Sequence, residues 1–103
     1  MANINVPSGA TVVVEILFST TNSPDSASIQ HSPVNQPSTT VQGAVRTLTV
    51  ATGDIVIPAI IGAPGASAQV QVSHNGNNVL SGWNGILTIR EGAKRASRQF
   101  VVA

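Results

Sequence analysis

A chain of 103 residues has room for one domain with a core of its own, and we expect residues 1–103 to form a single domain. Only 9% of the residues are charged and the formal net charge is +1, which gives no general attraction to nucleic acid or to an anionic membrane. The absence of cysteine excludes disulfides, thiolate metal sites and cysteine nucleophiles.

The chain shows no targeting or membrane segment. Residues 1–7 lack a basic region followed by an apolar one, so no secretory signal is expected there. The longest apolar stretch, Val12 to Phe18, is interrupted by Glu15 and is far shorter than the ~20 residues of a membrane span. We therefore expect a soluble protein without a membrane span, whose low charge causes little repulsion between copies.

Apolar residues do not recur at helical spacing, and β-branched runs between turn residues predict strands throughout. The first strong strand is residues 11–19. Its side chains form two rows on opposite faces, with Val12, Val14, Ile16 and Phe18 in one and Val13, Glu15 and Leu17 in the other. Because both rows are largely apolar, this strand is expected either to be central in a covered sheet or to bury its second face against an oligomer partner.

The next elements are weaker. Residues 20–40 are rich in Pro and Ser, so only a short edge strand near Ala27 to Gln30 is predicted. Residues 44–50 and 55–61 flank the turn at 51–54, which predicts a hairpin. Pro58 lacks an N–H group, so the returning strand is expected at a sheet edge or with a bulge.

The Asn75-Gly76 pair is the clearest local signal, because both residues tolerate the positive φ of a two-residue type I′ turn. This turn pairs His74 with Asn77. It also places two rows on opposite faces of the preceding strand: Val70 and Val72 in one, and Gln69, Gln71 and Ser73 in the other.

A turn at 82–85, a strand at 86–90, a polar basic segment at 91–97 and a last strand at 98–103 complete the chain. The last strand is expected to expose Arg98 and bury Phe100 and Val102, or the reverse. Together the elements predict an all-β fold, an antiparallel β-sandwich of eight or nine strands with Greek-key or immunoglobulin-like topology.

Residues for catalysis are sparse. The candidates for general acid, base or metal-ligand roles are His31, His74, Glu15, Asp25, Asp54 and Glu91. They are not clustered as metal ligands are, and no nucleophile elbow, P-loop, dinucleotide fingerprint or HExxH motif occurs. We therefore expect no metal, no cofactor and no enzymatic activity, and predict that both histidines are surface or turn residues.

Positive charge is concentrated near the C-terminus, where four of the five Lys and Arg residues occur: Arg90, Lys94, Arg95 and Arg98. This group is a candidate site for phosphate or a sulfated sugar, and the alternative is a solvated loop. No nucleic-acid motif accompanies it, so nucleic acid is not an expected partner.

The strongest candidate for a binding site combines one aromatic residue with amides. A sugar site needs an aromatic surface for C–H groups and fixed amides for hydroxyls. The residues that offer this mixture are Trp83, His74, Asn77, Asn78 and Asn84. In the alternative interpretation, Trp83 closes the end of the sandwich and the Asn residues only form turns.

The segment Ala68 to Gly76, together with the strand and turn pattern of Ala2 to Ser23, resembles the small soluble bacterial lectins that bind fucose and mannose through calcium. The resemblance implies a Greek-key sandwich in a homo-oligomer. The calcium loop of that family is a dense run of Asp and Asn, whereas residues 91–97 here are basic, so calcium binding is not carried over.

Two functions follow as hypotheses. The first is a non-enzymatic, lectin-like module that recognises a sugar or glycan through the residues around Trp83. The alternative is a self-assembling structural protein, such as a shell, fibre or particle component, supported by the sparse charge and the two apolar faces of residues 12–18. The expected partners are accordingly a glycan or other copies of the chain.

Overall fold

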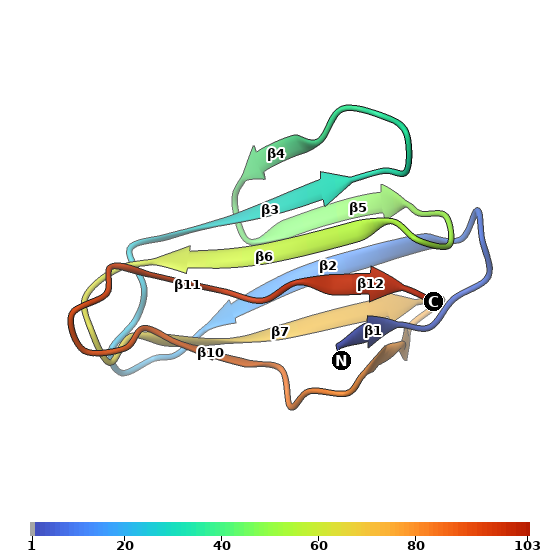
Figure 1. The fold of residues 1–103 in the computed structure, drawn as a ribbon. Helices are drawn as coiled ribbons and strands as arrows, with labels where there is room; N and C mark the ends of the chain where they lie inside the picture. Colours follow the sequence, from blue (N-terminus) through green and yellow to red (C-terminus); the bar gives the residue numbers. More distant parts are fainter. Residues whose placement is uncertain (1) are drawn as a thin grey trace.

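The computed structural model describes residues 2–103, which form a sandwich of two β-sheets (Figure 1). The first sheet has seven strands, in the order β4 (Thr39–Gln42), β3 (Ser26–Ser32), β6 (Ile55–Ile61), β12 (Phe100–Val102), β1 (Asn3–Ile4) and β9 (Leu80–Ser81), with β11 (Arg95–Ser97) also paired to β6. The second sheet has five strands, in the order β10 (Ile86–Thr88), β7 (Ser67–His74), β2 (Thr11–Phe18) and β5 (Val45–Thr49), with β8 (Asn77–Asn78) paired to β7.

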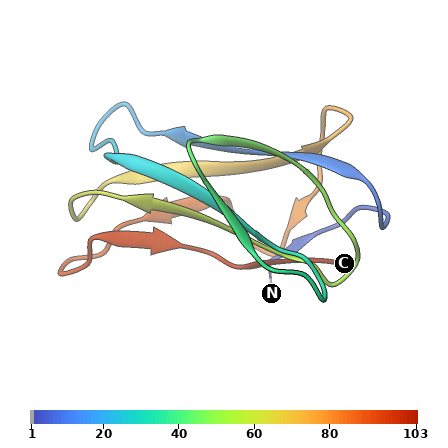
Figure 2. The same cartoon turned by 90° about the horizontal axis from the view of Figure 1, so that it is seen from above.

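The predicted all-β sandwich is confirmed. Seen from above, β2 and β7 lie in one layer and β6 and β12 in the other (Figure 2). Residues 2–103 contain twelve strand segments instead of eight or nine, because several are only two or three residues long. No helix in this part of the chain has the length and hydropathy needed to cross a membrane.

Strand β2 follows the predicted alternation. Val12, Val14 and Ile16 are at most 2% exposed and face the other sheet, whereas Val13 and Leu17 are 37% and 42% exposed on the outer face. Phe18 ends the inward row and is 36% exposed, because the strand ends there at the rim. Within residues 2–103, β2 makes extensive contacts only with its sheet neighbours β5 and β7. The exposed apolar residues on its outer face are therefore open to solvent or to a partner.

The core between the sheets consists of aliphatic side chains and one aromatic ring. Its largest fully buried members are Phe100, Ile4, Ile29, Ile60, Ile89, Val12, Val14, Val50, Val56, Val70, Val72 and Val102. Burying a side chain of this kind stabilises a fold by about 1.5–3 kcal/mol relative to exposure. The core therefore holds the sandwich together in a chain that has no disulfide.

The Pro- and Ser-rich region forms more strand than predicted. Strand β3 has seven residues and lies inside its sheet, paired with β6 on one side and β4 on the other. The prediction of an edge strand at Ala27 to Gln30 is therefore wrong, and the edge is β4. The prolines fall outside β3, at positions 24, 33 and 37, so they remove no ladder hydrogen bond from it.

The predicted hairpin of residues 44–50 and 55–61 is also wrong, because β5 and β6 belong to different sheets. The turn at 51–54 forms, with the Asp54 amide donating to the Ala51 carbonyl at 3.0 Å, but it carries the chain across the sandwich. Strand β6 is apolar on both faces and lies in the middle of its sheet, whereas β5 exposes Thr47 and Thr49 and lies at an edge. Burial thus decides which sheet each strand joins.

Pro58 lies in a central strand, contrary to the prediction of an edge or a bulge. Its carbonyl accepts a hydrogen bond from the Arg98 amide at 3.3 Å, so its nitrogen, which has no hydrogen, faces the same neighbour. That neighbour is paired with β6 as β11 on one side of Pro58 and as β12 on the other. The missing donor is therefore accommodated by a break in the adjacent chain at residues 98–99.

Other local predictions are confirmed. Asn75 and Gly76 have φ values of 52° and 81°, and the turn pairs His74 with Asn77 as expected. Of the two alternatives for the last strand, the structure shows the one in which Phe100 and Val102 are buried and Arg98, just before the strand, is exposed. One feature departs from the antiparallel prediction: β1 runs parallel to β12, which places the two ends of the described chain side by side.

Candidate functional site

The loop at residues 82–85, between β9 and β10, carries Trp83 and Asn84. Gly82 and Gly85 have φ values of 80° and 88°, a region that disfavours residues with a Cβ atom. A Cβ atom on Gly85 would lie 2.9 Å from the Val70 carbonyl oxygen, so glycine also allows the loop to approach β7. The Asn84 side chain accepts a hydrogen bond from the Ile86 amide at 3.0 Å and fixes the end of the loop.

Trp83 is half-buried and packs against the core. Its ring centroid lies 5.4 Å from that of Phe100, with the planes tilted by 42°. The guanidinium carbon of Arg98 lies over the Trp83 ring at 5.6 Å from its centroid, a cation–π geometry. Trp83 therefore packs against the core between the edge strands β9 and β10, and it also lines two clefts.

The first cleft, which we call the amide cleft, has a volume of about 390 Å³. Its lining residues are Gln69, Val70, Gln71, Val72, Ser73, Gly76, Asn78, Leu80, Trp83 and Asn84. None of these side chains carries a charge. The cleft thus combines one indole with carboxamides and a hydroxyl, which offer both donors and acceptors to a neutral ligand.

A gap in the edge of β7 explains where the amide cleft forms. Strand β7 is paired with β10 over residues 67–69 and with β8 over residues 73–74, but residues 70–72 have no strand on that side. The Val70 amide donates to Gly85 at 2.6 Å and the Val72 carbonyl accepts from Val79 at 3.0 Å. The alternation of an antiparallel strand then leaves the Val70 carbonyl and the Val72 amide facing the gap without a strand partner.

The structure brings together three of the five predicted ligand-binding residues. Trp83, Asn78 and Asn84 line the amide cleft, whereas His74 and Asn77 do not. His74 Nδ1 lies 2.8 Å from the Thr11 carbonyl oxygen, which ties the turn to β2. Sequence reasoning did not assign Gln69, Gln71 and Ser73 to the site, although they form the predicted outward row of that strand. The alternation along this strand already put the three residues in one row, but their proximity to Trp83 becomes visible only in the folded structure.

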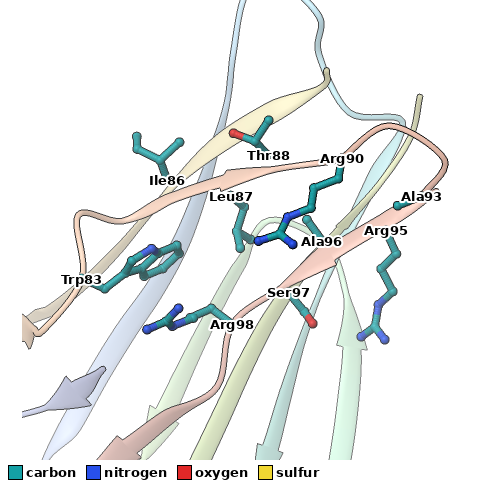
Figure 3. Close-up of a pocket in the computed structure, with 10 residues that line it drawn as sticks. All are labelled: Trp83, Ile86, Leu87, Thr88, Arg90, Ala93, Arg95, Ala96, Ser97 and Arg98. Atoms are coloured by element: carbon teal, nitrogen blue, oxygen red, sulfur yellow. The ribbon is translucent and has the colours of Figure 1, made fainter. Parts of the chain in front are cut away.

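The second cleft, which we call the arginine cleft, has a volume of about 460 Å³ and is also lined by Trp83 (Figure 3). Its lining residues are Trp83, Ile86, Leu87, Thr88, Arg90, Ala93, Arg95, Ala96, Ser97 and Arg98. It therefore contains three of the four residues predicted as an anion site, and Lys94 is not among them. Residues 95–97 are strand β11, where only a polar basic segment was predicted.

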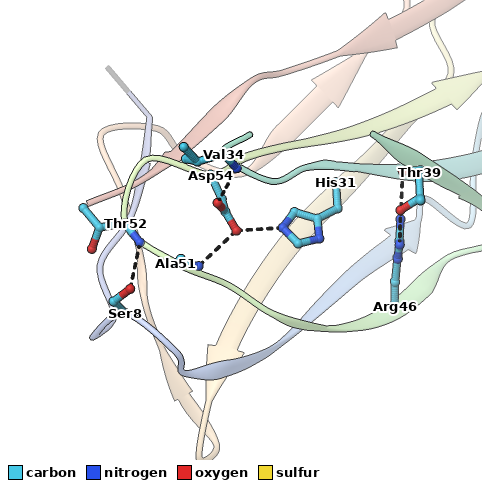
Figure 4. Close-up of polar contacts among 8 residues, drawn as sticks. All are labelled: Ser8, His31, Val34, Thr39, Arg46, Ala51, Thr52 and Asp54. Atoms are coloured by element: carbon cyan, nitrogen blue, oxygen red, sulfur yellow. Dashed lines mark hydrogen bonds and ion pairs between the residues drawn. The ribbon is translucent and has the colours of Figure 1, made fainter. Parts of the chain in front are cut away.

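A buried polar pair lies elsewhere, near the turn before β6 (Figure 4). His31 Nε2 is 2.9 Å from Asp54 Oδ2, and the two residues are 8% and 3% exposed. Asp54 also accepts hydrogen bonds from the Val34 and Ala51 amides, each at 3.0 Å. His31 is therefore not the surface residue that was predicted, because its ring satisfies a buried carboxylate.

The environment of Asp54 favours its charged form. Burial acts to raise the pKa of its carboxyl group. The hydrogen bonds from Ala51, His31 and Val34, with the charge of His31, act in the opposite direction and outweigh it, so the pKa of Asp54 is below its ordinary value of 3.8. Both carboxylate oxygens are occupied by groups of the protein, which indicates a structural role for this pair.

Comparison of the chain with protein-family models, with curated proteins and with solved structures finds no match, so the clefts themselves are the basis for an assignment of function.

Proposed function

We propose that this chain is a non-enzymatic binding module that recognises a sugar or glycan in the amide cleft. The observation that carries the proposal is the convergence of Trp83, Asn78 and Asn84 with Gln69 and Gln71 in one uncharged cleft. Sugar hydroxyls both donate and accept hydrogen bonds, and carboxamides match them in both roles. The apolar portion of the indole supplies contact for C–H groups.

Some of these polar groups are already fixed and others are free to meet a ligand. Asn78 makes hydrogen bonds of 3.2 and 3.5 Å with Leu80, and the Asn84 side chain caps the Ile86 amide. The Gln71 side chain is exposed on the face of β7 that also carries Gln69 and Ser73. The fixed Asn residues shape the cleft, and the exposed Gln71 side chain provides direct hydrogen bonds to the sugar.

The test is a titration with a panel of neutral mono- and oligosaccharides, in which binding is monitored through the fluorescence of Trp83, the single Trp of the chain. At least one sugar should shift the emission and release or absorb heat in calorimetry. Gln71→Ala should weaken its affinity about 5- to 10-fold, the loss expected for one hydrogen bond. The matched control is Gln42→Ala, an exposed amide on β4 that lies outside the cleft.

A panel that produces neither a fluorescence change nor heat would contradict the proposal. It would equally be contradicted if Gln71→Ala bound every sugar as tightly as the unmodified chain.

A second candidate function, self-assembly, is favoured by the outer face of the five-stranded sheet. Four large apolar side chains are 37–54% exposed there: Val13, Leu17, Val45 and Ile86. Leu17 and Ile86 lie on either side of Gln69, and Glu15 is the one formally charged residue that β2, β5, β7 and β10 present on this face. Strand β5 at its edge also has an unpaired side.

Light scattering over a range of concentrations tests this candidate. Copies that associate through this face should show a mass that rises with concentration, and Val45→Lys should reduce the mass to that of a monomer. Val41→Lys, at a similarly exposed valine of β4 in the other sheet, is the control. A compact monomer at high concentration would exclude the candidate.

A further inference from the structure

The arginine cleft and the amide cleft share one lining residue, Trp83. Arg90 follows β10, Arg95 begins β11, and Arg98 lies in the break between β11 and β12. Opposite Arg98 is Pro58, which has no N–H group to donate but accepts a hydrogen bond from the Arg98 amide at 3.3 Å. The side chain of Arg98 lies over the Trp83 ring, at 5.6 Å from its centroid.

The side chains of the cleft are arranged to receive a negative group. In Figure 3 the guanidinium groups of Arg90 and Arg98 extend into the space beside Leu87 and Trp83, whereas Arg95 extends away from them. The lining residues include no Asp or Glu. Within residues 2–103, none of the three arginines forms an ion pair. Their charge is therefore available to a ligand.

Arginine suits oxyanions in particular. Its planar guanidinium group donates paired hydrogen bonds to carboxylate, sulfate or phosphate, and it is more weakly hydrated than the ammonium group of lysine. The Thr88 and Ser97 hydroxyls of the same cleft add neutral donors. The chemistry of this cleft is thus that of one or two anionic groups attached to a polar ligand.

The positive charge is confined to this part of the surface. Arg46, the one other arginine, donates to the Ile29 and Thr39 carbonyl oxygens at 3.0 Å and to the Thr39 hydroxyl at 2.6 Å, so it joins the two sheets. With a formal net charge of +1, the chain lacks the long basic surface that a nucleic-acid backbone requires. A short ligand with a local negative group fits this distribution better.

We propose that the arginine cleft is the anionic subsite of the sugar site, and that the ligand is an acidic oligosaccharide. A sulfate or carboxylate group lies between Arg90 and Arg98, and a neutral sugar unit of the same molecule lies in the amide cleft across Trp83. This inference rests on the proposed function, because it names the class of glycan that the site selects.

Calorimetry with four probes tests the inference: a heparin-derived sulfated tetrasaccharide, its desulfated and carboxyl-reduced counterpart, inorganic sulfate, and a single-stranded oligonucleotide of equal charge. The sulfated sugar should bind at least tenfold more tightly than each of the others. Its log affinity should fall with log salt concentration with a slope of roughly −2, the release of about two counterions.

Variants separate the two clefts. Arg90→Gln and Arg98→Gln should each weaken the binding of the sulfated sugar at least fivefold, and Arg90→Gln should leave the affinity for its neutral counterpart unchanged. Lys94→Gln, which removes a positive charge outside the cleft, should alter neither affinity. Within the described chain the Arg90 side chain has no hydrogen bond, ion pair or ring contact, and only its backbone carbonyl accepts, from the Ala93 amide, so its substitution tests the subsite even if Arg98→Gln disturbs Trp83.

The failures are distinguishable. Equal affinity for the sulfated and neutral sugars, or no effect of the arginine variants, would overturn the anionic subsite and leave the amide cleft standing. Equal affinity for the oligonucleotide or for inorganic sulfate would overturn the choice of an acidic sugar. If the arginine variants weaken binding but Gln71→Ala does not, the amide cleft is not part of the binding site. Both the proposed function of the amide cleft and the two-cleft site would then be overturned.

Discussion

His31 Nε2 lies 2.9 Å from Asp54 Oδ2, and this contact joins β3 to the turn that carries the chain from one sheet to the other. The same carboxylate holds the Ala51 and Val34 amides, so three donors from three segments depend on one side chain. A buried donor that loses its partner retains its full cost of desolvation. The hydrogen bonds of Asp54 are therefore expected to contribute strongly to the free energy of unfolding.

Asp54→Ala should lower the free energy of unfolding by about 2–4 kcal/mol, because it leaves three donors without an acceptor. Urea unfolding measures the change. Asp25→Ala is the control, since Asp25 is exposed and its removal should change stability by less than about 0.5 kcal/mol. Equal effects of the two substitutions would show that the Asp54 centre does not stabilise the fold.

The same centre predicts a direction for acid sensitivity. Because the pKa of Asp54 is lower in the folded chain than its ordinary 3.8, the unfolded chain takes up the proton first as the pH falls. The contribution of Asp54 is therefore complete above its unfolded pKa and is lost as the pH falls through the lower, folded value. The free energy of unfolding, measured from about pH 6 to about pH 2.5, should show this loss. In Asp54→Asn the free energy of unfolding should fall less steeply over the same range.

Phe100→Ala should lower the free energy of unfolding by about 3–5 kcal/mol, because Phe100 is 0% exposed and the loss of its ring leaves a cavity beneath Trp83. The emission of Trp83 in the folded variant should also move to longer wavelength as water reaches the ring. Phe18→Ala provides the comparison at a ring that is 36% exposed, and it should cost clearly less. Similar costs for the two substitutions would show that Phe100 is not central to the core.

Two glycines should differ in their response to alanine. Both Gly76 and Gly85 have positive φ, so each substitution strains the backbone by about 1 kcal/mol. A Cβ atom at Gly76 meets nothing within 4 Å, whereas at Gly85 it would lie 2.9 Å from the Val70 carbonyl oxygen. Gly85→Ala should therefore be the more destabilising in thermal unfolding and should also weaken sugar binding, and the opposite order would contradict the close approach of the loop to β7.

Part of the candidate site could be predicted from the residues. The outward row of β7 follows from alternation, and Trp83 with Asn78 and Asn84 share a short stretch of chain. His74 and Asn77 were predicted with them, yet of that turn only Gly76 lines the cleft, and the His74 ring contacts the Thr11 carbonyl oxygen of β2. The meeting of Trp83 with Arg98 was not predictable, since it depends on how β9 and the segment between β11 and β12 are placed in the folded sheet.

Neighbouring residues alone settle the strand period of β2, the turn at Asn75 and Gly76, and the alternation that puts Phe100 and Val102 on one face of the last strand, whereas the structure shows that this face is the buried one. Alternation and turn chemistry act over a few residues, so a short segment already contains them. Only the tertiary structure decided that β5 and β6 join different sheets and that His31 meets Asp54. Those outcomes depend on which partners bury each face most completely, and the partners lie far apart along the chain.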